Sequence, residues 1–137
     1  MNDDKILISM ERLANSYLAL EQIGNLPNAP FKISYWAKKN RERLSSDYEI
    51  FVTRRNELFN KYLNVIDGAY GEYVNGVAKW NYKENMDKEF NEKLKELINY
   101  LVEISNPYLL KIDDTLLNGD FSISTNYLEL LDYLIED

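Results

Sequence analysis

The sequence predicts a mainly helical α+β domain, in which a long central helix is packed by shorter helices and accompanied by a small antiparallel β element. Three observations predict this fold. Apolar residues recur at spacings of three and four along most of the chain, as in amphipathic helices. The stretch from about residue 34 to 66 contains no glycine or proline. Asn75-Gly76 separates two short runs rich in valine and aromatic residues, which is typical of a β-hairpin.

The amino-terminal part of the chain predicts a strand followed by a helix. Residues 5–8 favour a short strand, and apolar spacing predicts a helix over 10–23 with Ser9 as its N-cap. We expect Gly24 to end this helix at the C′ position, and two prolines then make the connector rigid. Acidic residues stand where a signal peptide needs positive charge, so we expect no targeting signal and no transmembrane span.

The central helix, predicted over residues 34–66, is about 50 Å long at the α-helical rise. Its apolar stripe contains one permanent charge, Arg55, in the ladder Leu44, Tyr48, Phe51, Arg55, Leu58, Tyr62 and Val65. No acidic residue lies three or four positions from Arg55, so its own helix offers no ion pair. Three arrangements are open: the side chain reaches water over Phe51, meets a carboxylate from another segment, or marks an interface.

The turn sequence predicts how residues of the two hairpin strands are paired. A type I′ turn at Asn75 and Gly76 pairs Val74 with Val77 and Tyr73 with Ala78, and it places Glu72 opposite Lys79. One face then carries Tyr73, Ala78, Trp80 and Tyr82. A lone hairpin is marginally stable in water, so we expect this aromatic face to rest on the central helix or on a third strand.

Three elements are predicted after the hairpin. A helix begins after Asn85, with the apolar stripe Phe90, Leu94, Leu97 and Leu101. Residues 107–113 resemble a short edge strand after a proline. A final helix begins at the N-cap Ser124 and continues to the end of the chain, anchored by Leu131, Leu134 and Ile135.

Composition excludes several kinds of chemistry. The 137 residues match the size of one domain, which we place at 1–137, and they include no cysteine and no histidine. This excludes disulfides, thiolate nucleophiles and zinc sites of the usual type, and it removes the commonest general base. No nucleophile elbow, phosphate loop or EF-hand spacing is present. We expect a protein that is not an enzyme and that uses no cofactor or metal.

Charge is unevenly distributed. Residues 32–62 carry eight Lys/Arg against four Asp/Glu, whereas the rest of the chain carries eight against nineteen. The candidate binding residues are Lys38, Lys39, Arg41 and Arg43, together with Arg55. Glu42 interrupts this basic cluster and the net charge is −7, so we expect a solvated helix face and no nucleic-acid partner. The acidic carboxyl-terminal third either mimics nucleic acid or aids solubility; its acids include Asp113, Asp114, Asp120, Glu129, Asp132, Glu136 and Asp137.

The order of several short motifs resembles a family of small proteins of unknown function, encoded by tailed phages and prophages of Gram-positive bacteria. The matching runs are the opening "NDDKILISMERLANSYLAL", "SYWAKKN" (34–40), Phe51, "RNELFNKY" (55–62), "EFNEKLKEL" (89–97), "VEI" (102–104) and "LELLDYLIE" (128–136). The chain departs from the family in its longer aromatic insert "AYGEYVNGVAKWNY". The resemblance implies a phage origin and an accessory role, and it supplies no catalytic residues.

From these features we expect a phage-encoded, non-enzymatic protein that acts in the host cytoplasm by binding a host protein. Such a protein could inhibit a defence system, of the anti-CRISPR or another anti-defence type, or a nucleic-acid-processing enzyme. An alternative is an accessory protein of virion assembly that forms homo-oligomers through its long helix. Nucleic-acid binding through the basic part of the central helix is a third hypothesis.

Overall fold

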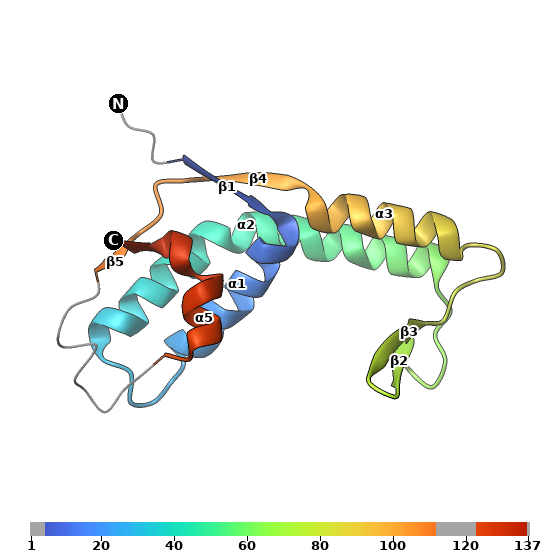
Figure 1. Cartoon of the computed structure of the whole chain (residues 1–137), viewed down its shortest axis with the longest axis horizontal. Coiled ribbons are helices and arrows are strands. Elements are labelled where there is room, and N and C mark those ends of the chain that lie inside the picture. Colours follow the sequence, from blue (N-terminus) through green and yellow to red (C-terminus); the bar gives the residue numbers. More distant parts are fainter. Residues whose placement is uncertain (1–4, 112–122, 137) are drawn as a thin grey trace.

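The computed structural model describes residues 5–111 and 123–136, and its elements form a compact body with a helical arm (Figure 1). In chain order the elements are β1 (Lys5–Ser9), α1 (Met10–Gly24), α2 (Phe31–Tyr62), β2 (Gly71–Val74), β3 (Val77–Trp80), α3 (Asp87–Asn99), β4 (Leu101–Ser105), β5 (Leu110–Lys111), α5 (Thr125–Leu130), the 3-10 helix η1 (Asp132–Leu134) and β6 (Ile135–Glu136). The predicted fold class, mainly α with a small antiparallel β element, is confirmed.

The body is held together by segments that lie far apart in the sequence. β1 pairs antiparallel with β4, from Lys5 opposite Ser105 to Ser9 opposite Leu101. β5 and β6 form a short parallel pair. Beneath these strands, α1 packs on the amino-terminal half of α2 and on α5. The core includes the fully buried side chains of Leu13, Leu20, Ile23, Ile33, Trp36, Leu44, Leu110, Leu131 and Leu134.

The arm consists of the carboxyl-terminal half of α2 and the whole of α3, which lie side by side and lead to the β2–β3 hairpin (Figure 1). A second, smaller apolar cluster holds the arm together, with Leu58, Tyr62, Leu63 and Phe90 buried. Leu97 packs against both clusters and so connects the arm to the body.

The bounds of α2 differ from the prediction at both ends. The helix begins at Phe31 because Pro30, with φ −58°, already supplies the backbone angle of the N-cap position. It ends at Tyr62, since Leu63 adopts an extended conformation and bridges to Tyr82. Val65, the last rung of the predicted ladder, therefore lies outside the helix and is 58% exposed.

Gly24 does not have the predicted C′ role. It is the last residue of α1, and Asn25 follows as the C-cap with φ −102°, so no left-handed residue ends the helix. A Cβ at Gly24 would lie 3.4 Å from Lys38 Cγ and 3.7 Å from Ala37 Cβ. Gly24 therefore lies at the contact between α1 and α2, where a Cβ would make ordinary van der Waals contacts.

Two expectations near the carboxyl terminus were wrong. Leu101 is not on the apolar stripe of α3, because α3 ends at Asn99 and residues 101–105 form β4, a strand that was not predicted. The final helix has the predicted N-cap, where Ser124 Oγ accepts from Tyr127 N, but it ends at Leu130 and gives way to η1 and β6. The predicted edge strand at 107–113 is reduced to the two residues of β5 among those described.

Polar contacts fix the carboxyl-terminal segment to the body. Arg12 Nη2 donates to Asp132 Oδ1 at 2.6 Å, and Arg12 Nε donates to the Leu130 carbonyl at 3.0 Å. The indole of Trp36 donates to the Leu134 carbonyl at 2.9 Å. Because these donors come from α1 and α2, the segment is anchored at two places.

One face of Tyr133 lies against the Arg12 guanidinium, 4.8 Å from the ring centroid. Burial raises the pKa of the Tyr133 hydroxyl above its usual value of 10.0, although the nearby Ser16 hydroxyl and the Arg12 charge oppose this shift. Neither the hydroxyl oxygen of Tyr133 nor that of Ser16 has a partner in hydrogen-bonding geometry. The body therefore contains one small, incompletely satisfied polar site.

Among the described residues, no helix is both long and apolar enough to cross a membrane.

Candidate binding surface at the tip of the arm

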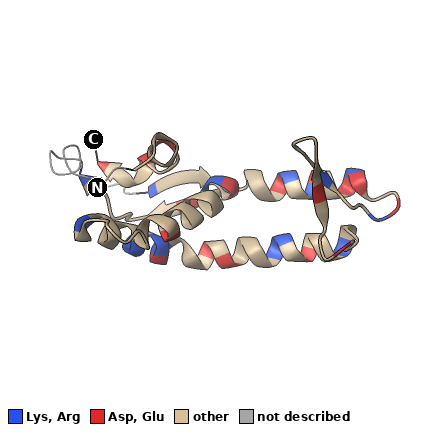
Figure 2. Ribbon diagram, turned by 90° about the horizontal axis from the view of Figure 1, so that it is seen from below, with Lys and Arg blue, Asp and Glu red and all other residues tan. Residues whose placement is uncertain are grey.

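The four predicted basic residues of α2 do not form one patch. Lys38 and Arg41 lie on one side of the helix and Lys39 and Arg43 on another, because each residue turns the helix by about 100°. Arg41 forms an ion pair with Glu21 on α1 at 3.6 Å. Lys39 Nζ lies 5.9 Å over the Tyr35 ring, and Arg43 donates to the Lys39 carbonyl. Figure 2 shows acidic and basic residues interspersed along the helices.

Arg55 lies between two aromatic rings of its own helix. Its guanidinium carbon is 5.5 Å from the Phe51 centroid and 5.7 Å from the Phe59 centroid. Nε is buried without a hydrogen-bond partner, and no ion pair joins Arg55 to a described carboxylate. The contact with Phe51 belongs to the first of the three arrangements left open by the sequence, but the buried Nε does not reach water, and Asp113, Asp114 and Asp120 lie outside the described residues, so the choice among the three stays a prediction.

The turn at the end of the hairpin has the predicted geometry. Asn75 and Gly76 have φ of 53° and 81°, the left-handed values that a type I′ turn requires. The strands pair in the predicted register, with Val74 opposite Val77. This turn leaves Tyr73 80% exposed and Val77 60% exposed. Two large apolar side chains are therefore presented to solvent at the tip of the arm.

Below the hairpin lies a cluster of aromatic rings. The Phe59 ring on α2 has its centroid 5.3 Å from Tyr70 and 5.1 Å from Trp80, with interplanar angles of 47° and 43°. Trp80 in turn meets Phe90 of α3 edge-on at 5.5 Å. The predicted support of the aromatic face by the central helix is thus seen for Trp80. It does not hold for Tyr73, whose ring is almost wholly in solvent.

These rings border a pocket of about 350 Å³ between the hairpin and α2, lined by Phe59, Tyr70, Gly71, Glu72, Tyr73, Ala78, Lys79 and Trp80. Gly71 is required at this place, because a Cβ there would lie 2.6 Å from the Lys79 carbonyl oxygen and 3.2 Å from the Trp80 ring. Glu72 and Lys79, which also line the pocket, are cross-strand partners in the hairpin, so the lining contains one acidic and one basic residue.

Hydrogen bonds fix the base of the hairpin to the end of α2. The Tyr70 hydroxyl donates to the Asn60 side chain, and Lys83 Nζ donates to the Asn60 carbonyl at 3.0 Å. Backbone bonds continue the ladder, from Asn81 N to the Tyr70 carbonyl at 2.8 Å and from Asn64 N to the Asn81 carbonyl at 2.7 Å. These bonds fix Tyr70 and the base of the hairpin, and Tyr73 is the most exposed aromatic residue of the pocket lining.

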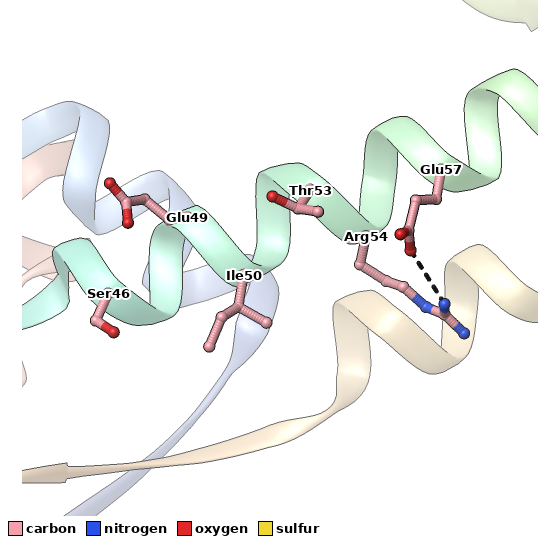
Figure 3. A pocket seen from close by; sticks show the side chains of 6 residues that line it. All are labelled: Ser46, Glu49, Ile50, Thr53, Arg54 and Glu57. Atoms are coloured by element: carbon pink, nitrogen blue, oxygen red, sulfur yellow. Dashed lines mark hydrogen bonds and ion pairs between the residues drawn. The ribbon is translucent and has the colours of Figure 1, made fainter.

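A second surface lies along the middle of α2 and is shown in Figure 3. It is lined by Ser46, Glu49, Ile50, Thr53, Arg54 and Glu57, all from this one helix. Arg54 donates to Glu57 at 3.2 Å, and Ile50 is 58% exposed. Because one helix supplies every lining residue, this surface is shallow and lacks the fixed walls of the tip pocket.

Metal-ligating clusters are not found in the described parts of the chain, where no three Asp or Glu residues converge. Of the acidic residues predicted near the carboxyl terminus, Asp113, Asp114, Asp120 and Asp137 lie outside the described residues. Asp132 is engaged with Arg12, and Glu129 and Glu136 are exposed.

Sequence reasoning found the hairpin but missed the pocket. Phe59 belongs to α2, Tyr70 to the following loop and Trp80 to β3, so no local spacing connects them. The available signal was the density of aromatic residues in "AYGEYVNGVAKWNY" together with Phe59 one turn beyond Arg55.

Comparison of the chain with protein-family models, with curated proteins and with solved structures finds no match. The function must therefore be argued from the site. The tip pocket offers aromatic faces and fixed backbone, an arrangement suited to holding a side chain of another molecule.

Proposed function

We propose that this protein is a non-enzymatic, phage-encoded binding protein that contacts a host protein through the tip of its arm. The hairpin and the aromatic pocket form the contact surface, and the body serves as the support. Inhibition of a host defence or nucleic-acid-processing enzyme is the form of action that we propose.

The observation that carries this proposal is the pair of exposed side chains at the tip, Tyr73 at 80% and Val77 at 60%. Exposing a large aromatic residue to water brings no stability to the monomer, whereas tyrosine is enriched among residues that dominate binding energy at interfaces. Here Tyr73 stands beside a preformed pocket on a helical arm, where a partner can reach it from several sides.

The host and the phage origin rest on the resemblance of the motifs described above, most of which lie on the helices that build the body and the arm. The hairpin insert is the part in which this chain departs from that family. A surface that departs from the family pattern, on a support that follows it, is the arrangement expected of a member that binds its own partner.

A pull-down from host lysate tests this proposal. The wild-type protein should retain one host protein in stoichiometric amount, and a Tyr73→Ser, Val77→Ser double variant should lose it. Phe31→Ser is the matched control, because Phe31 is 78% exposed but begins α2, at the far end of that helix from the arm tip. Retention of phage structural proteins alone, or equal retention by all three proteins, would contradict the proposal.

One observation favours a second candidate function, an accessory role in virion assembly through homo-oligomers. Ile50 in the middle of α2 is 58% exposed, and Tyr100 at the end of α3 is 65% exposed. Arg54 lies between them, since it lines the surface around Ile50 and also the groove that contains Tyr100. Light scattering after size-exclusion chromatography would then show a defined oligomer that Ile50→Glu dissociates, and a monomer at all concentrations would exclude this role.

A further inference from the structure

Aromatic rings form a large part of the lining of the tip pocket. Aromatic rings carry negative potential on their faces and attract ammonium or guanidinium groups placed over them. Four of the eight lining residues are aromatic: Phe59, Tyr70, Tyr73 and Trp80. Tyr70 and Trp80 are tilted by 47° and 43° against the Phe59 ring, which lies between them.

The segment that contains the hairpin carries an excess of negative charge. Residues 67–92, which contain the hairpin and the start of α3, carry six Asp/Glu against three Lys. The whole chain has a net charge of −7. Such an excess of negative charge raises the local concentration of cations and speeds their approach. Glu72 and Lys79, the two charged residues of the pocket lining, are cross-strand partners, so the lining itself carries no net charge.

Rings at this end of the molecule already bind cations within the chain. The Arg55 guanidinium lies over Phe59, which is also a wall of the pocket, and Lys61 Nζ lies 5.1 Å from the Tyr62 centroid. Neither contact uses the Tyr70, Tyr73 or Trp80 rings, and Tyr73 is 80% exposed to a cation from another molecule.

The size of the pocket limits the ligand. A volume of about 350 Å³ accommodates a single long side chain and is at the low end of the range for small-molecule sites. Because the pocket opens beside the exposed Tyr73, such a side chain can enter from the surface of a partner protein.

We propose that the tip pocket binds the cationic side chain of an arginine or lysine presented by the partner protein. This inference rests on the proposed function and specifies the chemistry that the partner must offer. Arginine fits the site better than lysine, since its planar guanidinium stacks on aromatic rings and is more weakly hydrated than an ammonium group.

Peptide titration with NMR detection tests the inference. The probe is acetyl-Gly-Arg-Gly-amide, and its matched control is the same peptide with citrulline, which has nearly the shape of arginine but no charge. The chain has two tryptophans, so their indole N–H resonances report separately on Trp80 in the pocket and on Trp36 in the body core. The arginine peptide should shift the Trp80 resonance saturably and leave Trp36 unchanged, and the citrulline peptide should bind at least about fivefold more weakly.

Two variants control for unspecific effects on peptide binding. Tyr73→Leu should weaken binding of the arginine peptide, and its fold should survive because the ring is almost fully exposed. Tyr100→Leu, at an exposed aromatic residue outside the pocket, should bind as the wild type does. Equal affinity for the arginine and citrulline peptides would show an apolar pocket without cation preference, and an unmoved Trp80 resonance up to the solubility limit of the peptide would show no site. Either result would overturn the inference.

This experiment and the pull-down can fail separately. A host protein that depends on Tyr73 and Val77, together with an unmoved Trp80 resonance, would preserve the proposed function and remove the cation site. A charge-selective peptide shift without a retained host protein would preserve the cation site and remove the proposed function.

Discussion

The two halves of α2 face different environments, although they belong to one uninterrupted helix. The amino-terminal half is enclosed by α1 and by the carboxyl-terminal segments, and it buries Ile33, Trp36, Ala37, Asn40 and Leu44. The carboxyl-terminal half meets α3 and the hairpin. Its Phe51 still belongs to the core of the body, whereas Leu58 and Tyr62 belong to the cluster of the arm. The body is thus covered on several sides, while the arm is a two-helix layer with a small aromatic cluster.

This difference indicates that the body provides most of the stability and that the arm provides the binding surface. Elements with few buried apolar groups open at lower free energy than a well-covered core, and binding surfaces are often drawn from them. We therefore expect the arm to open locally while the body remains folded. The following variants test this comparison, beginning with the largest expected effect.

Trp36→Ala should be the most destabilising change. The side chain is fully buried and its indole bonds to the Leu134 carbonyl, so the variant leaves a large cavity and an unpaired acceptor. The expected loss is about 3–5 kcal/mol in the free energy of unfolding, measured by urea denaturation. The arm has only a small apolar cluster and cannot stay folded without the body, so both should unfold together. An arm that keeps its structure while the body unfolds would reverse the comparison.

Phe90→Ala should act on the arm alone. Phe90 is fully buried and has Phe59, Tyr62, Trp80 and Tyr82 as ring neighbours within 6.1 Å. Its removal costs about 3–5 kcal/mol locally, which is enough to undock the hairpin. In two-dimensional NMR spectra, resonances of β2 and β3 should move to unstructured positions, while those of α1 and β1 stay in place. Loss of dispersion throughout the spectrum would show that arm and body form one unit.

Arg12→Met should loosen the carboxyl-terminal segment of the body. The variant removes the bonds to Asp132 and to the Leu130 carbonyl but keeps most of the apolar stem. The expected cost is about 1–3 kcal/mol in thermal or urea unfolding. Leu18→Met, at an exposed position of the same helix, is the control and should change little. Equal effects of the two variants would mean that the Arg12 contacts are not stabilising.

Arg55→Leu should have a small effect, within about 1 kcal/mol of the wild type in urea unfolding. The structure shows the guanidinium against Phe51 and Phe59 with no carboxylate partner among the described residues, so leucine preserves the apolar contact and removes an unsatisfied Nε. A loss of about 3 kcal/mol or more would instead indicate a carboxylate left unpaired by the change.

Tyr133→Phe should alter the dependence of stability on pH. Since the Tyr133 pKa is raised above 10.0 in the folded protein, the folded state holds this proton more tightly than the unfolded state. The resulting stability is fully present below pH 10 and is lost as the pH rises through the folded-state pKa. The variant should therefore lose less stability than the wild type between neutral pH and pH above 10, with Tyr35→Phe as an exposed control. Parallel pH profiles would contradict this account.

The parts of the fold that the sequence predicted correctly depend on local chemistry. Ser9 and Ser124 accept the hydrogen bonds expected of N-caps, and Asn75-Gly76 adopts the left-handed angles that its turn requires. Each of these is set by residues within three positions along the chain.

The parts that were missed depend on partners far away. Leu101 stands four positions after Leu97, so spacing alone continues the helix, whereas Tyr100 adopts an extended conformation and residues 101–105 pair with β1. The end of α1 also differs from the prediction, since the helix includes Gly24 and Asn25 caps it with φ −102°. The pocket could not be predicted because its rings come from three separate segments. Only the three-dimensional structure shows that Phe59 lies against Tyr70 and Trp80.

Native-state hydrogen exchange of the wild-type protein, followed at increasing urea below the unfolding transition, tests the division into body and arm most directly. The account predicts that amides of β2, β3 and α3 exchange through an opening that costs less free energy than global unfolding, while amides of α1 and the amino-terminal half of α2 exchange only with global unfolding. A single opening free energy shared by Phe90 in the arm and Trp36 in the body would contradict it.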